Sequence, residues 1–167
     1  MSDHDRLPDD PAGSAANQIA RATYQTGAVD TPSPSPPVFE PIEQSRDLTD
    51  AEMRAARTLA LAAGSELLAQ LDEATVTGLC RCGCSSVQLA TTSPPVTAKW
   101  LLSHSSRGRE DYLAISAVAE RADDRLITVT LHVVKGRVTE LELFDTVLGE
   151  GHPIDLSALQ MGPPALE

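Results

Sequence analysis

The chain has 167 residues, with 24 acidic and 13 basic side chains and a net charge of −11. A protein this acidic lacks the basic surface that binds nucleic-acid phosphates, so we expect no nucleic-acid partner. No segment approaches the roughly 20 apolar residues of a membrane-spanning helix. The acidic first ten residues, MSDHDRLPDD, do not resemble a secretory signal. We therefore expect a cytoplasmic protein without membrane contact.

The first 47 residues differ in composition from the rest of the chain. They contain seven prolines, eight acidic side chains and three basic ones. Such a segment buries too little apolar surface to offset the entropy lost on ordering. We predict a disordered, acidic, Pro-rich leader over 1–47, a single domain over 48–160 and a flexible tail over 161–167.

Helix signals follow the leader. Thr49 and Glu52 have the spacing of a capping box, which predicts a helix that starts at this point. Gly64 then either interrupts that helix or precedes a second one capped by Ser65. The second segment carries an apolar stripe at helical spacing, formed by Leu67, Leu68 and Leu71.

Strand patterns occupy most of the remaining chain. Period-2 alternation over 126–144, broken by a turn, predicts a hairpin. A two-residue loop at Lys135 and Gly136 would place Val129 opposite Glu142, a carboxylate against a core position. We therefore predict a three-residue loop, 134–136, with Gly136 at positive φ and Val129 opposite Leu141.

Further strands are predicted over 73–79, 86–91 and 113–117, with a loop over 92–110. Near the end of the chain Ile154, Leu156 and Leu159 are expected to lie against the domain edge. The predicted fold class is α+β, with one or two N-terminal helices packed on an antiparallel sheet of about five strands.

Three cysteines within five residues form the most unusual chemical feature: Cys80, Cys82 and Cys84. In an extended strand their side chains would point the same way. They can be small buried hydrophobes, metal ligands or redox thiols. Structural zinc usually takes four ligands and C-x₂-C spacing, so a fourth ligand would have to come from His104, from His132 or from another chain. Copper(I) can use two or three thiolates.

A second group of candidates lies on the outward face of the hairpin. His132, Glu140 and Glu142 form an acidic patch that we interpret as a surface for a protein partner. No Gly-rich phosphate loop, nucleophile elbow or H-E-x-x-H motif occurs. The sequence therefore favours a non-catalytic accessory or protein-interaction module that carries no cofactor and binds an unknown protein.

Two alternatives stay open. One is a thiolate protein that uses Cys80, Cys82 and Cys84 for zinc or copper binding or for redox chemistry. The other is an acidic decoy for a nucleic-acid-binding protein, since an acidic surface can imitate phosphates.

Two stretches, ELLAQLDEATVTGLCRCGCSSVQL and LHVVKGRVTELELF, resemble a family of short bacterial proteins, mostly actinobacterial. That family shares a helix, a strand leading to C-x-C-G-C-P-[ST], and a terminal hairpin reading H-V-V-D-G-R-L-x-E-L-E. Here Ser85 stands where Pro is common, and Lys135 and Val138 replace Asp and Leu. The resemblance covers 65–144. It implies a small α+β domain and supplies no activity.

Overall fold

The computed structural model describes residues 37–167, which all belong to one compact unit. These residues form an α+β fold with helices on an antiparallel sheet, as predicted, but the sheet has eight strands rather than about five. The helices are α2 (Asp50–Ala63), α3 (Ser65–Asp72), α4 (Ala98–His104) and the short 3₁₀ helix η2 (Leu156–Ala158). The strands are β1 (Phe39–Asp47), β2 (Ala74–Cys80), β3 (Val87–Thr91), β4 (Tyr112–Glu120), β5 (Leu126–Val134), β6 (Arg137–Asp145), β7 (Gln160–Met161) and β8 (Ala165–Leu166).

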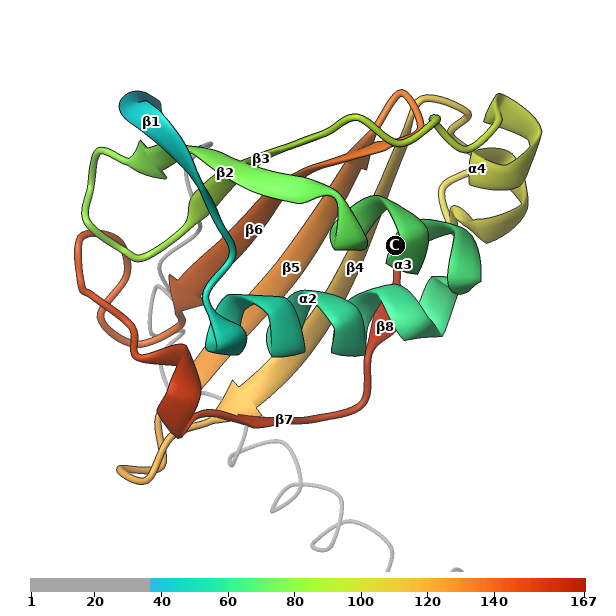
Figure 1. Ribbon diagram of the computed structural model, residues 1–167. Helices are drawn as coiled ribbons and strands as arrows, with labels where there is room; N and C mark the ends of the chain where they lie inside the picture. The colour runs from blue at the N-terminus through green and yellow to red at the C-terminus, as the bar shows by residue number, and fades with distance from the viewer. Residues whose placement is uncertain (1–36) are drawn as a thin grey trace, which may run out of the picture. The chain divides into compact units, whose positions relative to one another are not determined.

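The sheet runs in the order β1-β2-β3-β6-β5-β4-β7, and β8 also pairs with β4. Helices α2 and α3 lie across the face formed by β4, β5 and β6 (Figure 1). The core fills the space between these two layers, and aliphatic side chains dominate it. Its largest fully buried members include Leu59, Leu67, Leu71, Leu101, Leu113, Ile115, Ile127, Leu131, Leu141 and Leu143.

The predicted capping box begins α2. The Thr49 hydroxyl accepts a hydrogen bond from the Glu52 amide at 3.3 Å, and the Glu52 carboxylate accepts one from the Thr49 amide at 2.7 Å. Arg46 adds two hydrogen bonds to the same carboxylate, each 2.8 Å long. Gly64 separates α2 from α3, so of the two alternatives left open, one broken helix or two helices, the structure has two. Gly64, not Ser65 as predicted, is the N-cap of α3. No helix among residues 37–167 is long and apolar enough to cross a membrane.

Strand β1 differs from the expected leader. We placed 1–47 in a segment without regular structure, but Phe39–Asp47 pairs antiparallel with β2. Most of its side chains are exposed, so its order comes from backbone hydrogen bonds at the sheet edge. A low apolar content therefore does not exclude an edge strand. The rest of the predicted leader, 1–36, lies outside the described residues.

The other end of the chain is also paired. Residues 161–167 were expected to form a flexible tail, but β7 and β8 both bond to β4. Ile154 is buried, and Leu156 and Leu159 pack against the core as predicted. The predicted loop over 92–110 contains helix α4, whose cap is Thr97.

The hairpin of β5 and β6 corrects the predicted register. Its loop has two residues, Lys135 with φ +49° and Gly136 with φ +81°. Val129 therefore lies opposite Leu143, not opposite Leu141 as predicted. The expected clash of carboxylates with the core is avoided by a β-bulge in β6. Val138 pairs with Val133 and Glu140 pairs with His132, so Thr139 between them has no residue opposite it in β5. That extra residue restores the alternation of buried and outward side chains.

A single buried amide joins the hairpin turn to the helices. Gln70 of α3 donates hydrogen bonds to the carbonyl oxygens of Gly136 at 2.8 Å and Pro94 at 3.0 Å. Its own carbonyl oxygen accepts one from the Val138 amide at 2.9 Å. All three of these side-chain bonds go to backbone groups of the turn and its neighbours, which fixes α3 against the turn.

Candidate functional site

The three cysteines lie on the connection between β2 and β3. Cys80 ends β2, and its amide donates to the Ser86 carbonyl at 3.1 Å, which closes the connection at its base. Gly83 and Ser85 both have positive φ, at +82° and +69°. The chain thus forms a tight loop here instead of the extended strand that we assumed. The loop, rather than strand alternation, brings the cysteines together.

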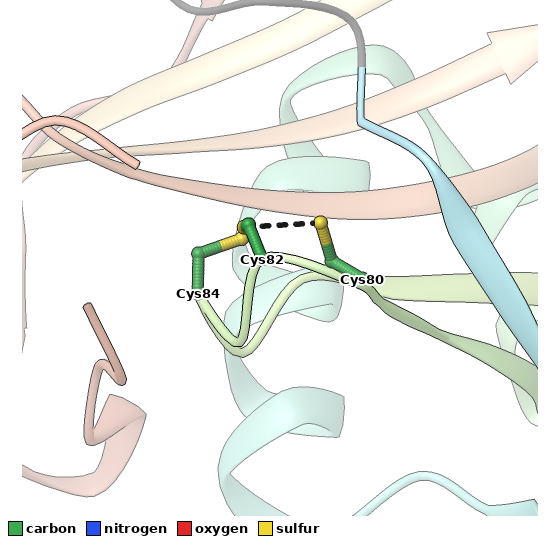
Figure 2. A group of neighbouring side chains, drawn as sticks. All are labelled: Cys80, Cys82 and Cys84. Carbon is green, nitrogen blue, oxygen red and sulfur yellow. Dashed lines mark hydrogen bonds between the residues drawn. The ribbon is translucent and has the colours of Figure 1, made fainter. Parts of the chain in front are cut away.

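The three side chains converge on one side of that loop (Figure 2). All three sulfur atoms lie within 4.8 Å of one another, and the Cys80 and Cys82 sulfurs are 3.2 Å apart. Cys84 is buried and donates to the Ser86 hydroxyl at 3.2 Å, whereas Cys80 and Cys82 are half-buried. Cys82 is the most exposed of the three.

These sulfurs form part of the wall of a pocket of about 400 Å³. Strand β6 supplies another part of the wall, through Glu142, Leu143 and Phe144. The remaining lining residues are Pro37, Val38, Arg81, Ser86 and Glu150. A ligand in this pocket would meet thiols, carboxylates and apolar groups together.

Hydrogen bonds distribute negative charge unequally over the three sulfurs. Burial opposes ionisation of Cys82, but interactions with the side chains of Cys84 and Cys80, and with the backbone of Cys84 and Gly151, lower the pKa of Cys82. Burial together with the hydrogen bond to Cys82 raises the pKa of Cys80 to about 12. Burial and Cys82 likewise raise the pKa of Cys84. Cys82 is therefore the sulfur of the three whose pKa favours ionisation in the metal-free loop.

Backbone amides of the loop also influence the ionisation of the three sulfurs, and they do so with the same spacing each time. A backbone hydrogen bond from Cys82 favours the ionised form of Cys80, one from Cys84 does so for Cys82, and one from Ser86 does so for Cys84. The backbone of the residue two positions later thus favours the ionised form of each sulfur. Donors aimed at a sulfur stabilise its anionic form, which is the form that binds metals.

The second predicted group forms a separate cluster on the face of β5 and β6 that points away from the helices. Nε2 of His132 lies 2.8 Å from a Glu142 oxygen, and its Nδ1 lies 2.7 Å from the Tyr112 hydroxyl. The side chains of His132 and Glu142 are only 17% and 18% exposed. Tyr112, which the sequence did not single out, comes from β4.

Glu140 is the unusual member of this cluster. It lies opposite His132 in the sheet, and its Oε1 atom is buried without a hydrogen-bond partner. Burial raises the pKa of Glu140 to about 7, with the neighbouring Glu142 adding to the rise and His132 opposing it. Donor atoms of His132, Glu140 and Glu142 all lie within 4.8 Å of one another.

Neither expected imidazole joins the sulfurs. His104 stacks on Trp100, with ring centroids 4.0 Å apart, and its Nδ1 lies 2.8 Å from the Trp100 carbonyl oxygen. His132 belongs to the carboxylate cluster instead. Within residues 37–167, the group formed by the sulfurs therefore contains no histidine.

No family model, no curated protein and no solved structure matches this chain. The resemblance carried by 65–144 therefore stays a prediction from its motifs. Proposals about function therefore depend on the chemistry of the cysteine cluster and of the cluster formed by His132, Glu140 and Glu142.

Proposed function

We propose that the protein binds a metal ion through the thiolates of Cys80, Cys82 and Cys84. The observation that supports this proposal is the convergence of three sulfurs, within 4.8 Å of one another, on an open pocket. Zinc–sulfur bonds of about 2.3 Å would hold the sulfurs about 3.8 Å apart. The spacing in the loop requires only small side-chain rotations to reach that value.

The main alternative is that the cysteines serve as small core residues. Packing alone requires sulfurs directed into apolar surroundings, as other buried cysteines are. Here two of the three are half-buried, and all three accept backbone hydrogen bonds that favour the thiolate. A neutral thiol that only fills space does not need such donors. They favour a site that carries negative charge.

The donor set suits Cu⁺ or Zn²⁺. Three thiolates complete the coordination that Cu⁺ prefers, whereas Zn²⁺ would need a fourth ligand. The pocket leaves room for that ligand, which could be a water molecule. A domain of this kind can also be the protein-interaction module predicted from the sequence, but no described contact identifies a partner.

Metal titration of the reduced full-length chain tests the proposal. We expect one equivalent of Zn²⁺ or Cu⁺ per chain, measured by competition with a chromophoric chelator. Replacing Cys80, Cys82 and Cys84 together by Ser should abolish this binding, while circular dichroism monitors the fold. The matched control is His104→Ala, which removes the other expected ligand and should leave the affinity unchanged. Binding that persists in the triple variant, or no binding by the reduced protein, would overturn the proposal.

A further inference from the structure

Two carboxylates share the half-buried face of β5 and β6 with one imidazole, and no Lys or Arg within residues 37–167 forms an ion pair with either carboxylate. Among the described residues, His132 is the only cationic partner of Glu142, and Glu140 forms no ion pair. Placing a carboxylate out of water without a cation or a proton is costly. Glu140 also has a buried oxygen with no donor. The cluster therefore lacks positive charge at a defined position.

We propose that His132, Glu140 and Glu142 form a second metal site, which binds a divalent ion that prefers oxygen and nitrogen ligands and is represented here by Mn²⁺. This site is distinct from the sulfur site and does not depend on it. Carboxylate and imidazole donors suit first-row divalent ions, and Mn²⁺ prefers them strongly over thiolates. An ion would supply the missing charge and give the Glu140 Oε1 atom a partner.

The geometry requires little rearrangement. Metal bonds of about 2.1 Å need donor atoms about 3 to 4 Å apart. Nε2 of His132 and Oε2 of Glu142 lie 2.8 Å apart, and the third donor, from Glu140, lies within 4.8 Å of both. The ion would replace the hydrogen bond between His132 and Glu142. Water molecules would complete the coordination.

Tyr112 supplies the support that a histidine ligand usually has. A metal-bound imidazole almost always donates its second N–H to a fixed acceptor, which sets the ring orientation. In this cluster Nδ1 of His132 lies 2.7 Å from the Tyr112 hydroxyl oxygen. With Nε2 on the ion, Nδ1–H would donate to that oxygen. Tyr112 is thus a positioning residue that does not touch the metal.

A route into the site exists through the pocket. Glu142 lines the same pocket of about 400 Å³ as the three cysteines. Its carboxylate can therefore meet an ion that arrives from solvent, before Glu140 is reached. Of the three ligands of the second site, Glu142 is the one that lines this pocket, and the two sites differ in ligand chemistry, so each has its own probe.

The test uses the full-length chain and Mn²⁺, with free Mn²⁺ followed by electron paramagnetic resonance. We expect one bound ion per chain, at least 10-fold weaker binding in Glu140→Gln, and a 10- to 100-fold loss in Tyr112→Phe, the usual cost of removing such support. Glu43→Gln, which changes an exposed carboxylate of β1, is the matched control and should have no effect. The variant with all three cysteines replaced should bind Mn²⁺ as the parent does.

The outcomes separate the two proposals. Loss of Zn²⁺ or Cu⁺ binding in the cysteine variant with Mn²⁺ binding retained would support both sites. A parent protein that retains no Mn²⁺, or Glu140→Gln binding as tightly as the parent, would overturn the second site. In that case a proton on Glu140, rather than a metal ion, balances the charge of the cluster.

Discussion

The sulfur of Cys80 lies 3.2 Å from the sulfur of Cys82, and the two thiols differ in the direction of their pKa shifts. Burial and the hydrogen bond to Cys82 raise the pKa of Cys80 to about 12, whereas hydrogen bonds outweigh burial at Cys82 and lower its pKa. Either sulfur can donate in this contact, and the pKa directions make Cys82 the one that ionises more readily. This asymmetry has a direct chemical consequence, because thiolates react and thiols do not.

We predict that iodoacetamide modifies Cys82 of the metal-free protein first at neutral pH. Cys82 has the lowered pKa and is half-buried, whereas Cys84 is buried with a raised pKa. Peptide mass spectrometry after short exposure measures the order of labelling. Equal labelling of all three thiols, or faster labelling of Cys80, would contradict it. Added Zn²⁺ should protect all three thiols if the proposed sulfur site is correct.

Ser86→Ala should lower the free energy of unfolding by about 1 to 3 kcal/mol. The Ser86 hydroxyl accepts from the Leu143 amide at 2.8 Å and contacts the Cys84 thiol at 3.2 Å, both in buried surroundings. Alanine would leave that amide unpaired. Urea denaturation measures the loss, and the exposed Ser45→Ala should change stability by less than about 0.5 kcal/mol. Equal effects of the two substitutions would contradict this account of Ser86.

Gly136→Ala should destabilise the fold by more than about 3 kcal/mol, because backbone strain and a steric clash add together. Gly136 has φ +81°, and a Cβ atom there would collide with the Val96 carbonyl oxygen. Gly108→Ala is the matched control, since Gly108 has φ +64° but open space around it. Its expected cost is about 1 kcal/mol, from strain alone. Thermal unfolding of both variants measures the difference, and Gly136→Val should be worse than either.

Stability should fall as the pH rises through about 7, the pKa of Glu140 in the folded protein. This pKa exceeds the ordinary value of 4.5, so the folded state holds the proton more tightly than the unfolded state does. The contribution is complete below about pH 4.5 and is lost above 7. After allowance for solvent screening it amounts to about 1 to 2 kcal/mol.

Glu140→Gln tests this dependence. The amide cannot ionise, so the variant should be more stable relative to the parent at pH 8 than at pH 5, as measured by urea denaturation in metal-free buffer. Glu43→Gln should reproduce the pH profile of the parent. A Glu140→Gln profile parallel to that of the parent would show that Glu140 does not titrate in this range.

Local signals in the sequence predicted several elements correctly. The capping box of Thr49 and Glu52 depends on residues three apart, and the structure places it at the start of α2. The strand alternation depends on neighbours two apart, so the existence of β2 to β6 was predictable. A shared direction of the three sulfurs was expected only for an extended segment over 80–84, whereas a tight loop between the two predicted strands produces it.

Features that depend on distant residues were not predictable. Strand β1 has few buried side chains, so its pairing with β2 leaves no periodic signal. Tyr112 reaches His132 only because β4 pairs with β5. Gln70 has no local signal for its role, because its acceptors at Gly136 and Pro94 lie far along the chain. The alternation of apolar and polar residues in β6 does not show where a bulge occurs, so the unpaired position of Thr139 was not predictable.

Thr139 makes β6 one residue longer than its pairing with β5 requires. Deleting Thr139 would leave Val138 opposite Val133 and Glu140 opposite His132, as they are now. Loss of a single codon at this position would therefore leave the buried side chains of β6 buried and the outward ones outward. A codon lost beyond Leu141 would instead exchange the two faces for the rest of the strand. Length variation among descendants of this protein should be tolerated at this one point of β6, with the imidazole and its two carboxylates left in place.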